Sequence, residues 1–302
     1  MTLSPPRSVR AFAPGHITGI FRPETTARDP RGHGSVGAGI VLELGAWAEA
    51  SFSPGARSRV RLIGDGRGPW PISEDVACRV APAETGTLTV RIAHELPIGQ
   101  GFGMSAAGAL ATALAVGALS ARPRELAVRV AHLADLFGGG GLGGVAAILG
   151  GGIEVRTRAG IPPFGKVVHR PFPFPLLIGV VGRPIPSPSV LHDPSALRRI
   201  ARAAEGWEEL ATDADPDRFF RLSERFTDRA GLASPAVRRT IVALRRRGAA
   251  AGQAMFGESF FARPRSDAAR AACLEWLRRE EIRAVEIRAA RRGAHLVPAR
   301  PE

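Results

Sequence analysis

Short runs in which apolar and polar residues alternate mark the first half of the chain as rich in strands. In residues 87–92, Leu88, Val90 and Ile92 alternate with polar neighbours, which is the period of a strand with one buried face. Glycine, proline and aspartate cluster at residues 64–69 and indicate a turn. The pattern predicts strands at residues 9–13, 39–44, 47–52, 59–63 and 87–92.

Longer apolar segments with helical spacing follow these strands. In residues 123–137, Leu126, Val130, Leu133 and Phe137 fall on one face of a helix, and Pro123 stands at its first position. A second helix is expected at residues 104–120. Further on, the pattern predicts helices at residues 194–210, 215–230, 235–247 and 266–279, strands at 166–169, 175–181, 284–288 and 294–297, and a strand pair at 252–262.

Mixed strands and helices without regular βα alternation indicate an α+β fold. The chain has 302 residues, of which 45% are hydrophobic, and this length favours two domains. A proline- and glycine-rich stretch at residues 160–165 marks the expected boundary. We therefore expect an N-terminal domain at residues 1–165 and a C-terminal domain at residues 166–302.

The net charge of +13 raises nucleic-acid binding as an alternative function. Nearly all basic residues are arginines, with Lys166 the only lysine, and they are spread along the chain. Charge alone argues for solubility and non-specific attraction. The chain has no tyrosine and few aromatic residues near its arginine runs on which bases would stack. We expect a solvated, arginine-rich surface and no nucleic-acid partner.

One uncharged segment, residues 104–121, approaches the length needed to span a bilayer. Its residues are mostly alanine and glycine, which favour lipid weakly, so we expect a buried helix and no membrane partner. The N-terminus shows no apolar stretch typical of a signal peptide. Cys78 and Cys273 are isolated from other cysteines and from histidines at ligand spacing, which argues against a disulfide framework or zinc site. These features favour a cytoplasmic protein.

The segment that most suggests chemistry is LPIGQGFGMSAA at residues 96–107. Gly99, Gly101 and Gly103 allow tight turns and expose backbone N–H groups on a concave surface. An alanine-rich helix follows directly, so its N-terminal N–H groups and dipole would face the same space and bind a triphosphate. Ser105 would reach a phosphate-bound metal ion or a backbone N–H from the first turn. The spacing fits neither a Walker loop nor a dinucleotide fingerprint.

This segment, read as Pro-x-Gly-x-Gly-x-Gly-Met-Ser-Ala-Ala, resembles the second signature motif of the GHMP kinases, and of archaeal pantoate kinases in particular. The string APGHITGIF at residues 13–21 resembles the N-terminal substrate-side motif of that family. The string AGQAMFG at residues 251–257 resembles its C-terminal glycine loop. Residues 34–40 and 151–166 also fit. The resemblance implies a two-domain GHMP kinase fold, with an N-terminal half like domain 2 of ribosomal protein S5.

The resemblance also implies ATP and Mg²⁺ as cofactors and gives roles to individual residues. Ser105 and Asp135 would coordinate Mg²⁺ and serve catalysis. The substrate would contact His16, Thr18, Gln253 and an arginine, for which Arg156 is the candidate because a guanidinium binds a carboxylate in two places. ATP would bind Pro97, Gly99, Gly101, Phe102, Gly103, Met104, Ser105, Ala106 and Ala107.

Two positions depart from the family pattern. Asp135 stands where these kinases have a metal-binding Glu, and an acidic residue in the last turn of a helix opposes the helix dipole, which indicates a role other than stability. Gly144, in the run GGGLGG, stands where the family has an Asp beside the acceptor hydroxyl, and it offers no base. Losing a general base costs about 10²–10⁴ in rate. Phosphoryl transfer, however, depends mainly on positioning and charge stabilisation.

We therefore expect an ATP- and Mg²⁺-dependent kinase that phosphorylates the terminal hydroxyl of pantoate, a small-molecule substrate, on the route to coenzyme A. One alternative is a catalytically impaired homologue that binds nucleotide without transferring phosphate. Another is a GHMP kinase for a different hydroxylated small molecule. The family likeness also allows a homodimer.

Overall fold

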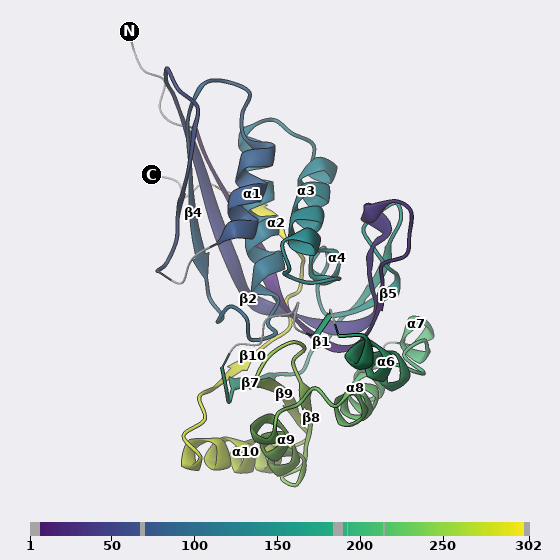
Figure 1. Ribbon diagram of the computed structural model, residues 1–302. Helices are drawn as coiled ribbons and strands as arrows, with labels where there is room; N and C mark the ends of the chain where they lie inside the picture. Colours follow the sequence, from purple (N-terminus) through teal and green to yellow (C-terminus); the bar gives the residue numbers. More distant parts are fainter. Residues whose placement is uncertain (1–6, 67–69, 184–189, 192, 214, 299–302) are drawn as a thin grey trace.

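Strands and helices are mixed in the computed structural model, which describes residues 7–66, 70–183, 190–191, 193–213 and 215–298. The described strands form two sheets, with helices packed against both (Figure 1). The α+β class predicted from the sequence is confirmed.

The larger sheet is organised around β2 (Gly34–Pro54), which changes partners along its length. Residues 46–54 of β2 pair with β4, whereas residues 37–40 pair with β5. Over the described residues the order is β11-β1-β2-β4-β3, with β5 also beside β2 and β6 beside β5. The other strands are β1 (Arg7–Glu24), β3 (Arg59–Ile63), β4 (Gly86–His94), β5 (Ile153–Arg158), β6 (Lys166–Arg170) and β11 (His295–Val297).

The first strand is longer than the sequence predicted. It continues through Pro14 and Gly15, where its register with β2 shifts, and the register shifts again between Thr18 and Ile20. Bulges of this kind bend a strand and are where a sheet tolerates proline. His16 therefore lies inside a strand and not beyond the end of the strand predicted at residues 9–13. The strands expected at residues 39–44 and 47–52 are likewise parts of one strand, β2.

Three helices, α1 (Pro71–Val80), α2 (Met104–Leu119) and α3 (Arg124–Phe137), lie together on one side of this sheet (Figure 1). The middle one, α2, packs against β1, β2, α1 and α3 and is buried along nearly its whole length. Its alanines and glycines let these elements approach closely. Among the described residues no helix is long and apolar enough to cross a membrane.

The buried face of α3 differs from the predicted one. Ala127, Ala131 and Ala134 are buried, whereas the predicted face is only partly buried and ends in Phe137, which is 69% exposed. The alanines of α3 form its buried face because the facing surface of α2 also consists of small residues, so the two helices pack closely. The short helix α1 was not predicted, since its apolar positions are few and follow a glycine-rich turn.

The smaller sheet has the order β10-β7-β9-β8 within the described residues. The helix expected at residues 194–210 is interrupted and forms α6 and the short α7. The remaining elements are η1 (Pro30–Gly32), α4 (Gly144–Ala147), β7 (Leu176–Val180), α6 (Pro194–Ala203), α7 (Glu209–Thr212), α8 (Pro216–Ala230), α9 (Pro235–Arg245), β8 (Ala249–Gln253), β9 (Ser259–Pro264), α10 (Asp267–Arg279) and β10 (Ala284–Ile287).

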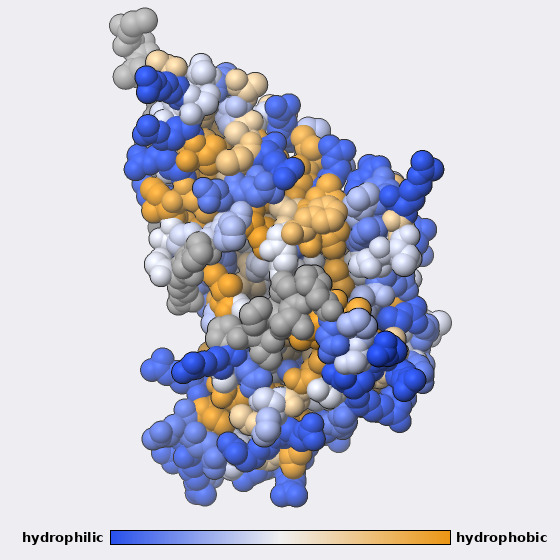
Figure 2. Space-filling model, viewed as in Figure 1, coloured by the Kyte–Doolittle hydropathy of each residue, from blue (hydrophilic) through white to orange (hydrophobic). Residues whose placement is uncertain are grey.

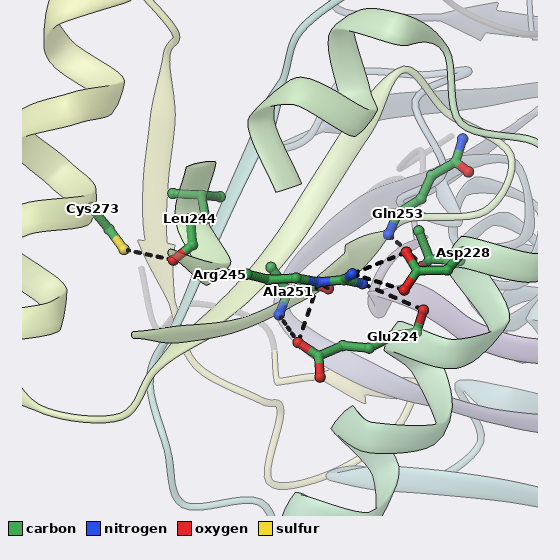
Figure 3. A network of polar contacts seen from close by, with 8 residues as sticks. Glu224, Asp228, Leu244, Arg245, Ala251, Gln253 and Cys273 are labelled. Carbon is green, nitrogen blue, oxygen red and sulfur yellow. Dashed lines mark hydrogen bonds and ion pairs between the residues drawn. The ribbon is translucent and has the colours of Figure 1, made fainter. Parts of the chain in front are cut away.

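Arg245 at the end of α9 ties three elements of this half together (Figure 3). Its Nη1 donates to both carboxylate oxygens of Asp228 at 2.9 Å, and its Nε donates to the carbonyl of Ala251 at 3.0 Å. Glu224 accepts from the Ala251 N–H at 3.0 Å. Strand β8 is thereby fixed against α8 and α9, and with it the loop that follows at residues 254–257.

The two sheets do not divide the chain at a single point. β6 follows residue 165 directly and pairs with β5, and β11 returns from the C-terminal side to pair with β1. The domain division at residue 165 stays a prediction. Figure 2 shows hydrophilic residues over both the upper and the lower part of the visible face, with hydrophobic residues between them.

We predict that α2 tolerates larger side chains only at its exposed position. Ala113→Leu places extra methyl groups at a fully buried site and should lower the free energy of unfolding by about 1–3 kcal/mol. The same change at exposed Ala118 should leave it within about 0.5 kcal/mol of the parent. Chemical denaturation followed by circular dichroism measures both. Equal effects would contradict the tight packing described for α2.

Candidate functional site

A cavity of about 290 Å³ lies where β1, the start of α2 and the loop after β8 meet. It brings together His16, Thr18, Ser105 and Asp135, which the sequence had placed in one site. Larger grooves of about 740 and 670 Å³ lie along α9–α10 and α3, away from these residues. The cavity is lined by His16, Thr18, Phe21, Ser35, Ile72, Ile98, Gly99, Gly101, Gly103, Met104, Ser105, Ala106, Asp135, Gly139, Gly140, Gly141, Leu142, Gly143, Gly144, Met255 and Phe256.

The loop between β4 and α2 forms one wall of the cavity and needs its glycines. Gly99, Gly101 and Gly103 have φ values of +74°, +75° and +68°, which side chains rarely adopt. A β-carbon at Gly101 would also lie 2.5 Å from the carbonyl oxygen of Ala254. Alternate left-handed residues turn the backbone so that successive N–H groups can face one concave surface.

This loop is held by hydrogen bonds to both halves of the molecule. The His16 N–H donates to the carbonyl of Phe102 at 2.9 Å. The Ser259 hydroxyl donates to the carbonyl of Gln100 at 2.5 Å, and the Gln100 side chain donates to the carbonyl of Gly182 at 3.0 Å. The position of the loop therefore depends on β1 and on β9 together.

Helix α2 begins at the inner end of the loop, after the left-handed Gly103. No side chain among the described residues caps this end. The first N–H groups of a helix have no partner within it, and its dipole is positive there, so the cavity offers an anion-binding surface. Of the residues predicted to bind ATP, Pro97, Phe102 and Ala107 do not line the cavity, and Phe102 and Ala107 are buried in the core.

Asp135 lies beside Ser105 at this same end of the cavity. The residue is 2% exposed, its carboxylate accepts a hydrogen bond from the Ser105 hydroxyl, and its Oδ1 has no hydrogen-bond partner among the described residues. Burial raises the pKa of the Asp135 carboxyl to about 7, and the Ser105 hydroxyl only partly opposes this. Asp135 is therefore not a solvated residue at a helix end. An unpaired buried carboxylate oxygen next to a hydroxyl suits a cation.

The glycine-rich run at residues 139–144 lies around Asp135 and is too closely packed for side chains at Gly140 and Gly144. A β-carbon at Gly140 would lie 1.9 Å from Asp135 Oδ1, and one at Gly144 would lie 2.6 Å from the β-carbon of Ala106. Because α4 packs closely against α2 at this point, an acidic side chain would not fit at Gly144 without a shift of the backbone. Among the described residues no group of three His, Cys, Asp or Glu side chains forms a metal site of its own.

His16, which also lines the cavity, belongs to a buried polar cluster that the sequence did not reveal. Its Nε2 lies 2.9 Å from Oε1 of Glu154, and its Nδ1 lies 3.5 Å from the Thr18 hydroxyl. Arg156 forms an ion pair with the same Glu154 oxygen. A hint was present in the alternation of Ile153, Glu154, Val155 and Arg156, which places both charged residues on one face of β5.

Charge compensation sets the protonation of this cluster. Burial opposes ionisation of Glu154, but Arg156 and His16 outweigh it and lower the pKa of the Glu154 carboxyl. Burial lowers the pKa of His16, although its hydrogen bond to Glu154 acts in the other direction. Near neutral pH the cluster therefore holds an ionised Glu154 and a neutral His16.

Arg156 and Gln253 lie behind the cavity wall. The Nε of Arg156 donates to the carbonyl of Ser35 at 3.2 Å, and a β-carbon at Gly143 would lie 2.9 Å from that Nε. Gln253 donates through Nε2 to the carbonyl of Gly257 at 3.0 Å and so supports the loop carrying Met255 and Phe256. Direct contact of Arg156 or Gln253 with a substrate stays a prediction.

Comparison with known proteins places this chain in a family. Residues 73–152 match the GHMP kinases N terminal domain. A pantoate kinase of Thermococcus kodakarensis is 33% identical over 231 residues, which cover 74% of this chain and 76% of the relative. A pantoate kinase of Methanospirillum hungatei is 32% identical over 264 residues, which cover 84% of this chain and 86% of the relative.

A solved structure described as a phosphotransferase related to the CoA biosynthesis pathway has the same architecture. It matches with a TM-score of 0.86 and 28% sequence identity, covering 96% of this chain and 99% of that one. The chain belongs to the pantoate kinase family of the GHMP kinases.

Proposed function

We propose that this protein transfers the γ-phosphoryl group of ATP to the terminal hydroxyl of pantoate, giving 4-phosphopantoate on the route to coenzyme A. One observation carries the proposal: a single cavity joins an anion-binding loop and helix N-terminus to a wall of polar side chains from β1. Phosphoryl transfer requires both an anchored triphosphate and an acceptor hydroxyl placed in line with it. Family membership points to pantoate as the acceptor.

The triphosphate end of the cavity would be formed by the glycine loop and the first turn of α2. Ser105 and Asp135 would hold Mg²⁺ there, since Asp135 Oδ1 is buried without a partner and Ser105 lies beside it. Mg²⁺ commonly takes one or two protein oxygens and completes its shell with phosphates and water. When bound, it would neutralise charge on the phosphates. The protein residues fit this ion.

The acceptor end would be formed by His16 and Thr18, with Arg156 behind them. Both charges of the Glu154–Arg156 pair are compensated, but Arg156 Nη2 has no hydrogen-bond partner among the described residues. This remaining donor supports the expectation that Arg156 binds the substrate carboxylate. Gln253 would act by supporting the loop at residues 254–257.

The direct test is ADP formation by the purified protein with ATP, Mg²⁺ and a panel of hydroxy acids that includes pantoate. Turnover with pantoate above the other acids is expected. Nucleotide binding without turnover on any acid would favour the impaired homologue, for which the missing side chain at Gly144 is the specific observation. Turnover on another acid alone would identify a different hydroxylated substrate.

The glycine loop yields a prediction for nucleotide affinity. Gly101→Ala forces a side chain into a left-handed conformation and against the Ala254 carbonyl, so the Kd for ATP should rise at least about tenfold. Gly66→Ala is the matched control, because Gly66 has a φ of +81° but open space around it. Isothermal titration calorimetry measures both. Wild-type affinity in Gly101→Ala would rule out this loop as the phosphate cradle.

Asp135 yields a prediction for stability against pH. A carboxyl whose pKa is raised to about 7 binds its proton more tightly when folded, so the protein loses stability as pH rises from about 4 through 7. Asp135→Asn should therefore raise the free energy of unfolding of the ligand-free protein by up to about 4 kcal/mol at about pH 8, and by much less at about pH 4. The Tm should rise accordingly. Kinase turnover should fall.

The control for this substitution is Asp267→Asn, at an exposed position in the first turn of α10. It should leave the difference in Tm between acid and alkaline pH as in the wild type. Adding Mg²⁺ with ADP should stabilise the wild type more than Asp135→Asn. A lower Tm for Asp135→Asn at alkaline pH would show that Asp135 is a structural partner and not a poised ligand.

A further inference from the structure

Phosphoryl transfer to a hydroxyl releases a proton, and the cavity offers few groups to accept it. Among the described residues that line the cavity, only Asp135 and His16 carry ionisable side chains. Asp135 lies at the phosphate end beside Ser105. Gly144 has no side chain, and its close packing on Ala106 leaves no room for one. His16 is the remaining acceptor.

The neighbours of His16 fix which ring nitrogen carries the proton. Glu154 is ionised and can only accept, so His16 Nε2 must donate to it across the 2.9 Å contact. The other nitrogen, Nδ1, then presents a lone pair, and the Thr18 hydroxyl at 3.5 Å is the group that faces it. Thr18 is half-buried and lines the cavity.

The contact between His16 and Glu154 is built into the sheet. Residues 16 and 154 lie on β1 and β5, with β2 between them, and Gly39 of β2 is paired with Thr18 on one side and Glu154 on the other. A β-carbon at Gly39 would lie 2.3 Å from His16 Nε2 and 2.8 Å from Glu154 Oε1. The two side chains meet across an intervening strand only because that strand has a glycine there.

We propose that Thr18, His16 and Glu154 form a proton relay that takes the proton from the acceptor hydroxyl. Thr18 touches the substrate hydroxyl, His16 receives the proton through Thr18, and Glu154 orients His16. This inference rests on the proposed function and adds the route of the proton to it.

In the reaction, the acceptor oxygen forms a bond to the γ-phosphorus while the bond from that phosphorus to the bridging oxygen breaks. ADP leaves with the electron pair of the broken bond. The acceptor's proton passes to the Thr18 oxygen as the Thr18 proton passes to His16 Nδ1. The resulting imidazolium lies against the Glu154 carboxylate, which Arg156 keeps ionised. The proton returns to water after the product leaves.

The experiment compares three Thr variants in steady-state pantoate phosphorylation. Thr18→Val keeps the shape but removes the hydroxyl, and kcat should fall about 10²-fold or more, as expected for a lost proton transfer. Thr18→Ser restores a hydroxyl and should recover most of the rate. Thr89→Val, on a partly buried position of β4 outside the cavity, should match the wild type. The Kd for ATP should stay within about twofold in all three.

His16→Gln supplies a pH readout that a structural role would not produce. Its kcat should be about 10²–10⁴-fold below wild type at neutral pH. The ratio of wild-type to variant kcat should shrink as pH falls, because protonated His16 cannot accept a proton. The charged and titratable groups around His16 are Glu154, Arg156 and His169. Burial lowers the pKa of His16 below the ordinary histidine value, so the ratio should begin to shrink below that pH.

The outcomes separate the relay from the proposed function. No turnover of pantoate by the wild type would overturn both. Pantoate turnover that persists in Thr18→Val or in His16→Gln would overturn the relay and leave the kinase assignment standing. A ratio of wild-type to His16→Gln kcat that stays constant with pH would assign His16 a structural role and would also overturn the relay.

Discussion

The site depends on a close approach between the backbone of the glycine loop and the backbones of β1 and of the loop after β8, which only glycine permits. The loop before α2 passes between β1 and the loop after β8, with Gly101 against the Ala254 carbonyl and Gly103 against the backbone of His16. These contacts join the larger sheet to the smaller one, and hydrogen bonds from His16 and Ser259 to the loop reinforce them. The N-terminus of α2 is thereby aimed into the cavity, and a substrate bound there would contact both halves of the molecule.

The pKa values of two buried carboxyl groups in and beside this cavity are shifted in opposite directions. Glu154 is paired with Arg156 and His16, and its pKa is lowered. Within the part of the chain that the structure describes, the Asp135 carboxyl has the Ser105 hydroxyl as its hydrogen-bond partner and no counter-charge, and burial raises its pKa. Because an ionised group without a counter-charge is costly in the interior, Asp135 is stabilised only by a proton or a cation. Glu154 therefore stays ionised as part of the folded structure. The charge of Asp135 depends on whether a cation is bound in the cavity.

Much of the fold could be predicted from local pattern, because the strands and helices carry clear periods and the glycine loop has a motif of its own. Local pattern failed where tertiary packing decides. The buried face of α3 is set by the alanines of α2, and the continuity of β1 through Pro14 is set by its pairing with β2. Glu154 escaped notice for the same reason: its partner His16 is distant in sequence and reaches it across Gly39, so no window of sequence contains the interaction.

Gly144 shows how sequence and structure together change the meaning of a departure from a family pattern. From sequence, a glycine where relatives have an acid signals impaired chemistry. In the structure, the glycine is packed against Ala106, and the run from Gly139 onwards folds around Asp135. Positioning and charge stabilisation account for most of the acceleration of phosphoryl transfer. In the proposed function these tasks fall to the loop, α2 and Asp135, which meet in one cavity. What Gly144 removes is one way of accepting a proton, and the relay proposed through Thr18 and His16 would supply another.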